Sequence, residues 1–101
     1  MIESYILSLL VPPEVRDDLT DWLLAFHHEL TFTSRPVDHH GADPAALGTA
    51  EQVSGHQRRL EVAVQVSAEE VETLLSELQE AFPGAGWAYR VLPLWASGRI
   101  A

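Results

Sequence analysis

The chain has 101 residues and a formal net charge of −9, which leaves room for one small domain, residues 1–101. The sequence contains fifteen Asp and Glu residues and six Arg residues, and it has no Lys, Asn or Cys. The acidic balance argues against nucleic-acid binding, and the lack of thiols excludes disulfides, thiolate metal sites and a cysteine nucleophile. We expect a cytoplasmic protein without membrane insertion, because no apolar run is long enough and no basic signal region is present.

The first half of the chain predicts a strand, a helix and a second strand. Residues 2–11 alternate with apolar side chains on both faces, which indicates a strand. Pro12 and Pro13 end it and start a helix that extends to about His28. The apolar stripe of this helix consists of Val15, Leu19, Trp22, Leu23 and Phe26. Residues 30–38 predict the second strand, and Pro36 indicates that this strand lies at a sheet edge or is bulged there.

The second half of the chain also predicts a strand, a helix and a strand. Residues 59–66 alternate regularly, which is typical of a half-buried strand. The capping box from Ser67 to Glu70 opens a helix that ends at Pro83 and Gly84. Residues 87–95 predict the last strand, so the order is β-α-β-β-α-β, an α+β ferredoxin-like fold.

That fold places both helices on one face of a four-stranded antiparallel sheet. The first and last predicted strands carry apolar residues on both faces, so the helix-free face is also partly apolar. An apolar sheet face of this kind is usually covered. We therefore expect a partner subunit, and closed cyclic symmetry is the commonest form.

Histidines and an acid flank the long segment between the two central strands. Imidazole and carboxylate suit Zn, Cu, Ni or Co, and a hairpin would bring the segment ends together. Asp38, His40 and His56 are the metal candidates. His39 points away from His40 in an extended chain, so one of the two serves. The alternative is that these are solvated loop histidines.

Arginines and aromatic residues form two further candidate groups. Arg58 and Arg59, with Glu51 and Gln52, suit contact with an anion or nucleotide, or else the arginines pair with nearby acids. The aromatic residues of the last strand suit base stacking, but an interface is favoured. They are Trp87, Tyr89 and Trp95.

Catalytic motifs are missing from the sequence. There is no nucleophile elbow, no Gly-rich phosphate loop and no Asn for acylphosphatase-type chemistry. We therefore expect the protein not to be an enzyme.

Four stretches together resemble the PII-like signalling proteins, and more narrowly a PII-like family of unknown function often encoded beside heavy-metal efflux pumps. They are residues 7–13 leading into 21–24, residues 32–37 with 40–41, residues 50–59, and residues 91–94 with 97–99. The resemblance implies a homotrimer with inward-facing sheets, a flexible T-loop at about residues 39–57, and a small-ligand site at its base between subunits. The positions assigned to this site are Ser34, Gly41, Glu51, Gln52, Gly55, Arg58 and Arg59.

The sequence departs from the PII pattern where PII proteins bind ATP. The loop at residues 83–86 has no basic residue, and Leu94 and Ala96 stand where the pattern has Arg. A triphosphate needs such counter-charges, so a divalent heavy-metal ion is the better candidate than ATP. Two functions follow: a trimeric regulatory sensor acting on a membrane efflux transporter or another protein, or a histidine-based metal-binding accessory protein without a nucleotide-sensing role.

Overall fold

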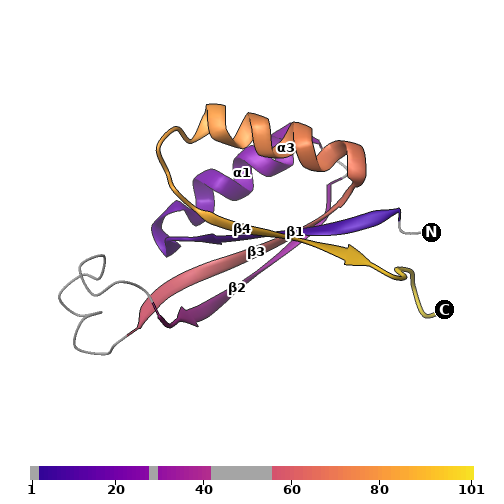
Figure 1. Cartoon of the computed structure of the whole chain (residues 1–101), viewed down its shortest axis with the longest axis horizontal. Coiled ribbons are helices and arrows are strands. Elements are labelled where there is room, and N and C mark those ends of the chain that lie inside the picture. The colour runs from indigo at the N-terminus through magenta and orange to yellow at the C-terminus, as the bar shows by residue number, and fades with distance from the viewer. Residues whose placement is uncertain (1–2, 28–29, 42–55) are drawn as a thin grey trace.

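The computed structural model describes residues 3–27, 30–41 and 56–101. The elements in chain order are β1 (Ser4–Val11), the 3-10 helix η1 (Pro13–Val15), α1 (Arg16–Phe26), β2 (Phe32–His39), β3 (Gln57–Ser67), α3 (Ala68–Ala81) and β4 (Ala88–Leu94). The strands form one antiparallel sheet in the order β2-β3-β1-β4. Both helices lie on the same face of that sheet (Figure 1). The predicted ferredoxin-like α+β fold is confirmed.

Each of the two central strands, β1 and β3, has a row of apolar side chains that lies beneath the helices. Leu7 pairs with Val64 and Leu9 with Val62, and all four are at most 2% exposed. Alternate residues of β1, including Ile6 and Leu10, point to the opposite face, on which none of the described helices lies. We call this second surface the open face. Leu7 and Leu9 therefore belong to the core, and the open face is the one left for a partner.

The helices meet the sheet through the predicted apolar stripes. Leu19 and Leu23 of α1 and Leu74 and Leu78 of α3 are buried against the sheet. The proline-started first helix begins with one 3-10 turn and becomes α-helical only at Arg16. No helix among the described residues is long and apolar enough to cross a membrane.

The predicted capping box at the start of α3 is present. The Glu70 backbone N–H donates to the Ser67 hydroxyl at 3.3 Å, and the Ser67 backbone N–H donates to the Glu70 carboxylate at 2.9 Å. The Ser67 backbone N–H, followed by its hydroxyl, holds the pKa of Glu70 below its ordinary value. These bonds satisfy groups that the helix leaves unpaired at its start.

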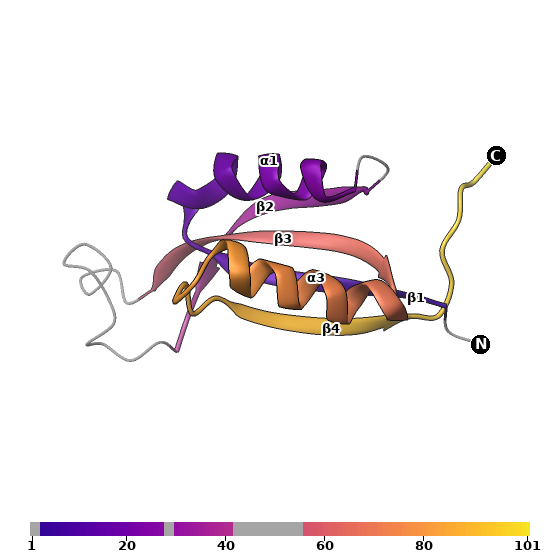
Figure 2. The ribbon, with the colours of Figure 1, turned by 90° about the horizontal axis from the view of Figure 1, so that it is seen from above.

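The segment between β2 and β3 is shorter than expected at both ends. His39 belongs to β2 and Gln57 to β3, and the two residues pair across the hairpin. The central part of this segment, residues 42–55, lies outside the described residues. Pro36 lies in β2, which pairs with β3 alone, so the predicted edge position is confirmed (Figure 2).

Candidate functional site

Three of the predicted metal ligands come together at the far end of the β2–β3 hairpin. The Asp38 carboxylate lies 3.3 Å from His56 Nε2, and the His40 and His56 rings lie 5.4 Å apart between centroids. The His56 side chain is 25% exposed and that of Asp38 is 61% exposed. This cluster, which we call the hairpin-end cluster, joins the last residues before the segment 42–55 to the first residue after it.

The cluster forms because of the strand register. Asp38 pairs with Arg58 and His39 with Gln57, so the chain leaves β2 and enters β3 at the same level. The last registered pair is His39 with Gln57. His40 comes directly after this pair on β2 and His56 directly before it on β3, which places the two histidines next to each other. Paired strand ends need no contribution from the intervening residues to bring these side chains close.

His39 lies beside the cluster in sequence but belongs to the opposite side of β2. It is half-buried, and its Nδ1 is fully buried with no hydrogen-bond partner among the described residues. Strand alternation explains why it diverges from its neighbours. His40 therefore lies with the other two candidates, and His39 does not.

The cluster has ligand chemistry without a preformed ligand geometry. Within residues 3–27, 30–41 and 56–101, no group of three or more His, Cys, Asp or Glu is already arranged to hold a metal ion. Asp38 and His56 contact each other directly instead. A metal ion would have to replace that contact, and the His40 ring would have to turn toward it.

The residues assigned to the small-ligand site are not all gathered at this end. Ser34 pairs with Val62, four residues before Asp38 along the same strand, or about 13 Å away. Arg58 is exposed, and the Arg59 guanidinium donates to the Arg58 carbonyl oxygen at 2.7 Å. Gly41 takes a left-handed φ of 87° at the turn out of β2. Glu51, Gln52 and Gly55 lie outside the described residues.

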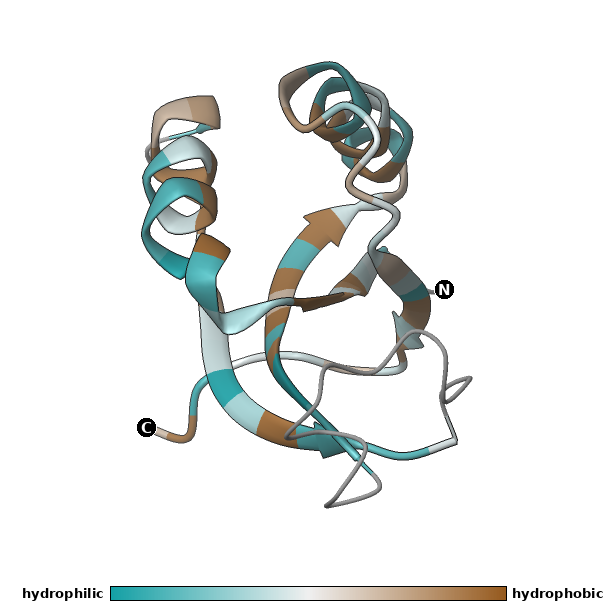
Figure 3. Ribbon diagram, turned by 90° about the vertical axis from the view of Figure 1, so that its left-hand side faces the viewer, coloured by the Kyte–Doolittle hydropathy of each residue, from teal (hydrophilic) through white to brown (hydrophobic). Residues whose placement is uncertain are grey.

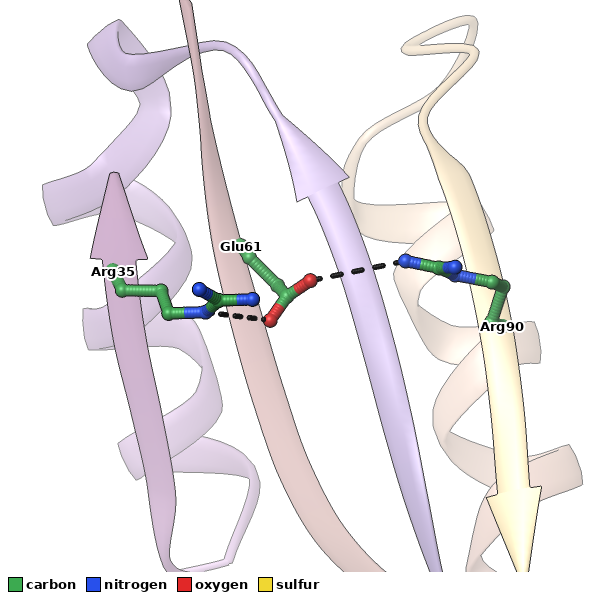
Figure 4. A network of polar contacts seen from close by, with 3 residues as sticks. All are labelled: Arg35, Glu61 and Arg90. Atoms are coloured by element: carbon green, nitrogen blue, oxygen red, sulfur yellow. Dashed lines mark hydrogen bonds and ion pairs between the residues drawn. The ribbon is translucent and has the colours of Figure 1, made fainter. Parts of the chain in front are cut away.

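A charged network on the open face was not predicted. Glu61 of β3 accepts a hydrogen bond from Arg35 Nε of β2 at 3.0 Å, and its second oxygen lies 3.8 Å from Arg90 of β4 (Figure 4). Glu61 is only 18% exposed, whereas both arginines are largely exposed. The regular alternation of apolar and polar residues in β3 predicts that Glu61 lies on this face. The identity of its two arginine partners depends on the order of the strands in the sheet.

The loop after α3 borders a small apolar cavity. The cavity has a volume of about 200 Å³ and lies between Leu75, Phe82, Trp87 and Tyr89, with Leu9 beneath. The Phe82 and Trp87 rings are 4.9 Å apart between centroids. The described residues that line it include no Arg or Lys. The described residues around this cavity therefore supply no counter-charge for a phosphate.

Comparisons with solved structures give the same fold. A DUF3240 family protein from Shewanella baltica OS155 superimposes with a TM-score of 0.78 at 17% identity, covering 100% of both chains. A Bacillus cereus protein related to NIF3 gives 0.64 at 16% identity, covering 97% of this chain and 27% of that one. A functionally unknown protein from Pediococcus pentosaceus ATCC 25745 gives 0.63 at 13%, covering 99% and 100%. At such identities the likeness shows the fold alone.

Sequence comparison adds the family. No curated protein matches the chain. A family model described as "Protein of unknown function (DUF3240)" matches residues 1–101, the whole sequence. The chain therefore belongs to the DUF3240 family of proteins of unknown function.

Proposed function

We propose that this chain is a non-catalytic, metal-responsive regulatory protein of the PII-like type. It binds a divalent transition-metal ion (Zn, Cu, Ni or Co) through Asp38, His40 and His56. The observation that carries the proposal is the proximity of these side chains, which flank the segment 42–55 on both sides. One carboxylate and two imidazoles form a ligand set that these ions favour over Mg or Ca.

Binding proceeds by replacement of the Asp38–His56 contact. The ion takes a place between the carboxylate and His56 Nε2, which are already 3.3 Å apart, and the His40 ring turns in as the third ligand. Water or a residue beyond the described ranges completes the coordination. The net charge of −9 favours a cation over a polyanion, although salt screens this field within about 8 Å.

Metal binding at this place has a direct route to regulation. Ligands on both sides of residues 42–55 tie the two ends of that segment to one ion, so occupancy restricts the conformations open to it. A partner protein that binds the segment, such as a membrane efflux transporter, then distinguishes the metal-bound protein from the metal-free protein.

We further propose that the protein assembles as a homotrimer through the open face. Leu92 is 50% exposed there, and Ile6 and Leu10 are half-buried without a helix above them. The charged network of Arg35, Glu61 and Arg90 crosses the same surface. Apolar surface with a few charged groups is typical of an interface between subunits.

Titration calorimetry with Zn, Cu and Ni salts, and in parallel with ATP, ADP and AMP, tests the ligand. We expect metal binding to weaken at least about tenfold in His56→Ala and His40→Ala, because each loses a ligand. Asp38→Asn should also weaken it, since it removes the only carboxylate of the cluster. Binding should weaken in acid, because a protonated imidazole cannot coordinate a metal.

His27→Ala is the matched control. It removes one imidazole at the end of α1, at the opposite end of β2 from the cluster, and should leave metal affinity unchanged. Tight nucleotide binding, or metal binding that ignores the substitutions at His40 and His56, would show that the ligand or its site is wrong.

The accessory-protein alternative differs in what metal binding requires. A carrier that only holds the ion needs a single hairpin, so its metal affinity does not depend on assembly. In a sensor, metal affinity at the hairpin depends on assembly through the open face. A Leu92→Glu variant that is monomeric but keeps full zinc affinity favours the accessory role. Loss of affinity together with loss of assembly favours the sensor.

A further inference from the structure

The outer surface of the helix layer contains an acidic groove with an aromatic floor. It lies between α1 and α3, has a volume of about 670 Å³, and is lined by Trp22, Ala25 and Phe26 on one side and by Thr73, Glu77 and Glu80 on the other. We call it the interhelical groove. Figure 3 shows the two helices standing side by side over the sheet.

The floor of the groove is a chain of aromatic contacts that joins the two helices. Trp22 stacks on Phe26 at 5.5 Å between ring centroids, and its other side meets Phe82, just after α3, at 6.1 Å in an edge-to-face arrangement. Trp22 and Phe26 remain half-buried rather than buried. The described residues therefore leave part of both rings uncovered in the groove.

Charge on the described helices is almost entirely negative. The described helical residues 13–26 and 68–81 include nine carboxylates and a single arginine, Arg16. The residues lining the groove include two glutamates and no basic residue. By contrast, the open face carries Arg35, Arg59 and Arg90 against Glu61. The described helices are therefore strongly acidic, and two of their carboxylates line the aromatic groove.

We propose that the interhelical groove binds a basic, amphipathic peptide segment of a partner protein. Lys or Arg side chains of that segment pair with Glu77 and Glu80, and apolar side chains pack on Trp22 and Phe26. A cation that reaches across Trp22 also gains a cation–π contact. The spacing of the lining residues, i, i+3 and i+4 on α1 and i, i+4 and i+7 on α3, presents two parallel rows to a helix laid between them.

Fluorescence anisotropy with a labelled Leu–Lys amphipathic peptide tests this inference, with a Leu–Glu peptide of the same length beside it. We expect the basic peptide alone to bind. The double variant Glu77→Gln, Glu80→Gln should weaken binding about fivefold, the effect of losing two exposed charge pairs. The indole N–H signal of Trp22 should shift on titration in an NMR spectrum.

The matched control is the double variant Asp17→Asn, Glu72→Gln. It removes the same amount of charge from the same two helices at exposed positions that do not line the groove. We expect less than about a twofold change in affinity. An equal loss in both double variants, no binding of the basic peptide, or an unmoved Trp22 signal would each overturn the proposal. None of these results bears on metal binding at the hairpin end.

Discussion

The two faces of the central strands β1 and β3 differ although they share the same backbone. Toward the helices, residues such as Leu9 and Val62 are at most 2% exposed. On the open face, the neighbouring Leu10 is half-buried, and Glu61 holds two arginines from the outer strands. The covered face is buried by the chain's own helices, whereas on the open face the described residues leave apolar and charged groups partly exposed. The covered face therefore accounts for folding, and the open face is the surface on which the proposed assembly depends.

The largest expected effect comes from a pair of identical substitutions on adjacent residues. Leu9→Ala should lower the free energy of unfolding by about 2–5 kcal/mol, because it leaves a cavity in the core. Leu10→Ala should cost only about 1 kcal/mol in dilute, monomeric protein, since its side chain is only partly buried in one chain. Urea denaturation measures both. Equal costs at every protein concentration would contradict the difference between the faces.

A charge on the open face should separate folding from assembly. Leu92→Glu adds a carboxylate at a position that is 50% exposed in one chain, so the fold should survive. In a trimer closed through this face, the same carboxylate would be buried without a partner, which is strongly unfavourable. We expect a folded monomer by sedimentation velocity. Val91→Glu, on the same strand but the helix side, is the control, and assembly unaffected by Leu92→Glu would contradict the proposed interface.

The capping box tests whether the helix layer depends on a local signal. Ser67→Ala should cost about 1 kcal/mol of stability at neutral pH. The lowered pKa of Glu70 means that its charge stabilises the fold above the ordinary pKa of a glutamate, and this contribution is lost as pH falls through the lowered value. The deficit of Glu70→Gln should therefore shrink in acid. A deficit that grows in acid would contradict the assigned bonds.

The smallest expected effect concerns the charged network. Glu61→Gln leaves Arg35 and Arg90 without their shared carboxylate and should cost about 0.5 kcal/mol in monomeric protein. High salt should remove most of that cost, because both arginines are exposed. A much larger cost that persists in high salt would indicate that the network is buried, as it would be within an assembly.

Particular residues show what could be predicted from the sequence. The alternation of Leu60 to Val66, the capping box at Ser67 and the two prolines at the first helix each act locally, so the elements and the fold were predicted correctly. Asp38, His40 and His56 were grouped because a hairpin brings its ends together. Their contact distances depend on strand register, which no local pattern fixes.

The network around Glu61 could not be predicted from the sequence. Arg35 and Arg90 are neighbours of Glu61 only because β1 and β3 are central and β2 and β4 lie outside them. The interhelical groove was also missed, because Trp22 and Phe26 read as core residues on an apolar stripe. Nothing in that pattern distinguishes a buried ring from a half-buried one beside glutamates.

Native mass spectrometry of the zinc-loaded protein tests the central claim most directly, because it counts chains and ions in one spectrum. The account predicts a species of three chains that carries one zinc ion for each chain. The His56→Ala variant should keep three chains and lose the zinc, and the His27→Ala control should keep both. A single chain that binds zinc as well without His56 as with it would contradict the claim.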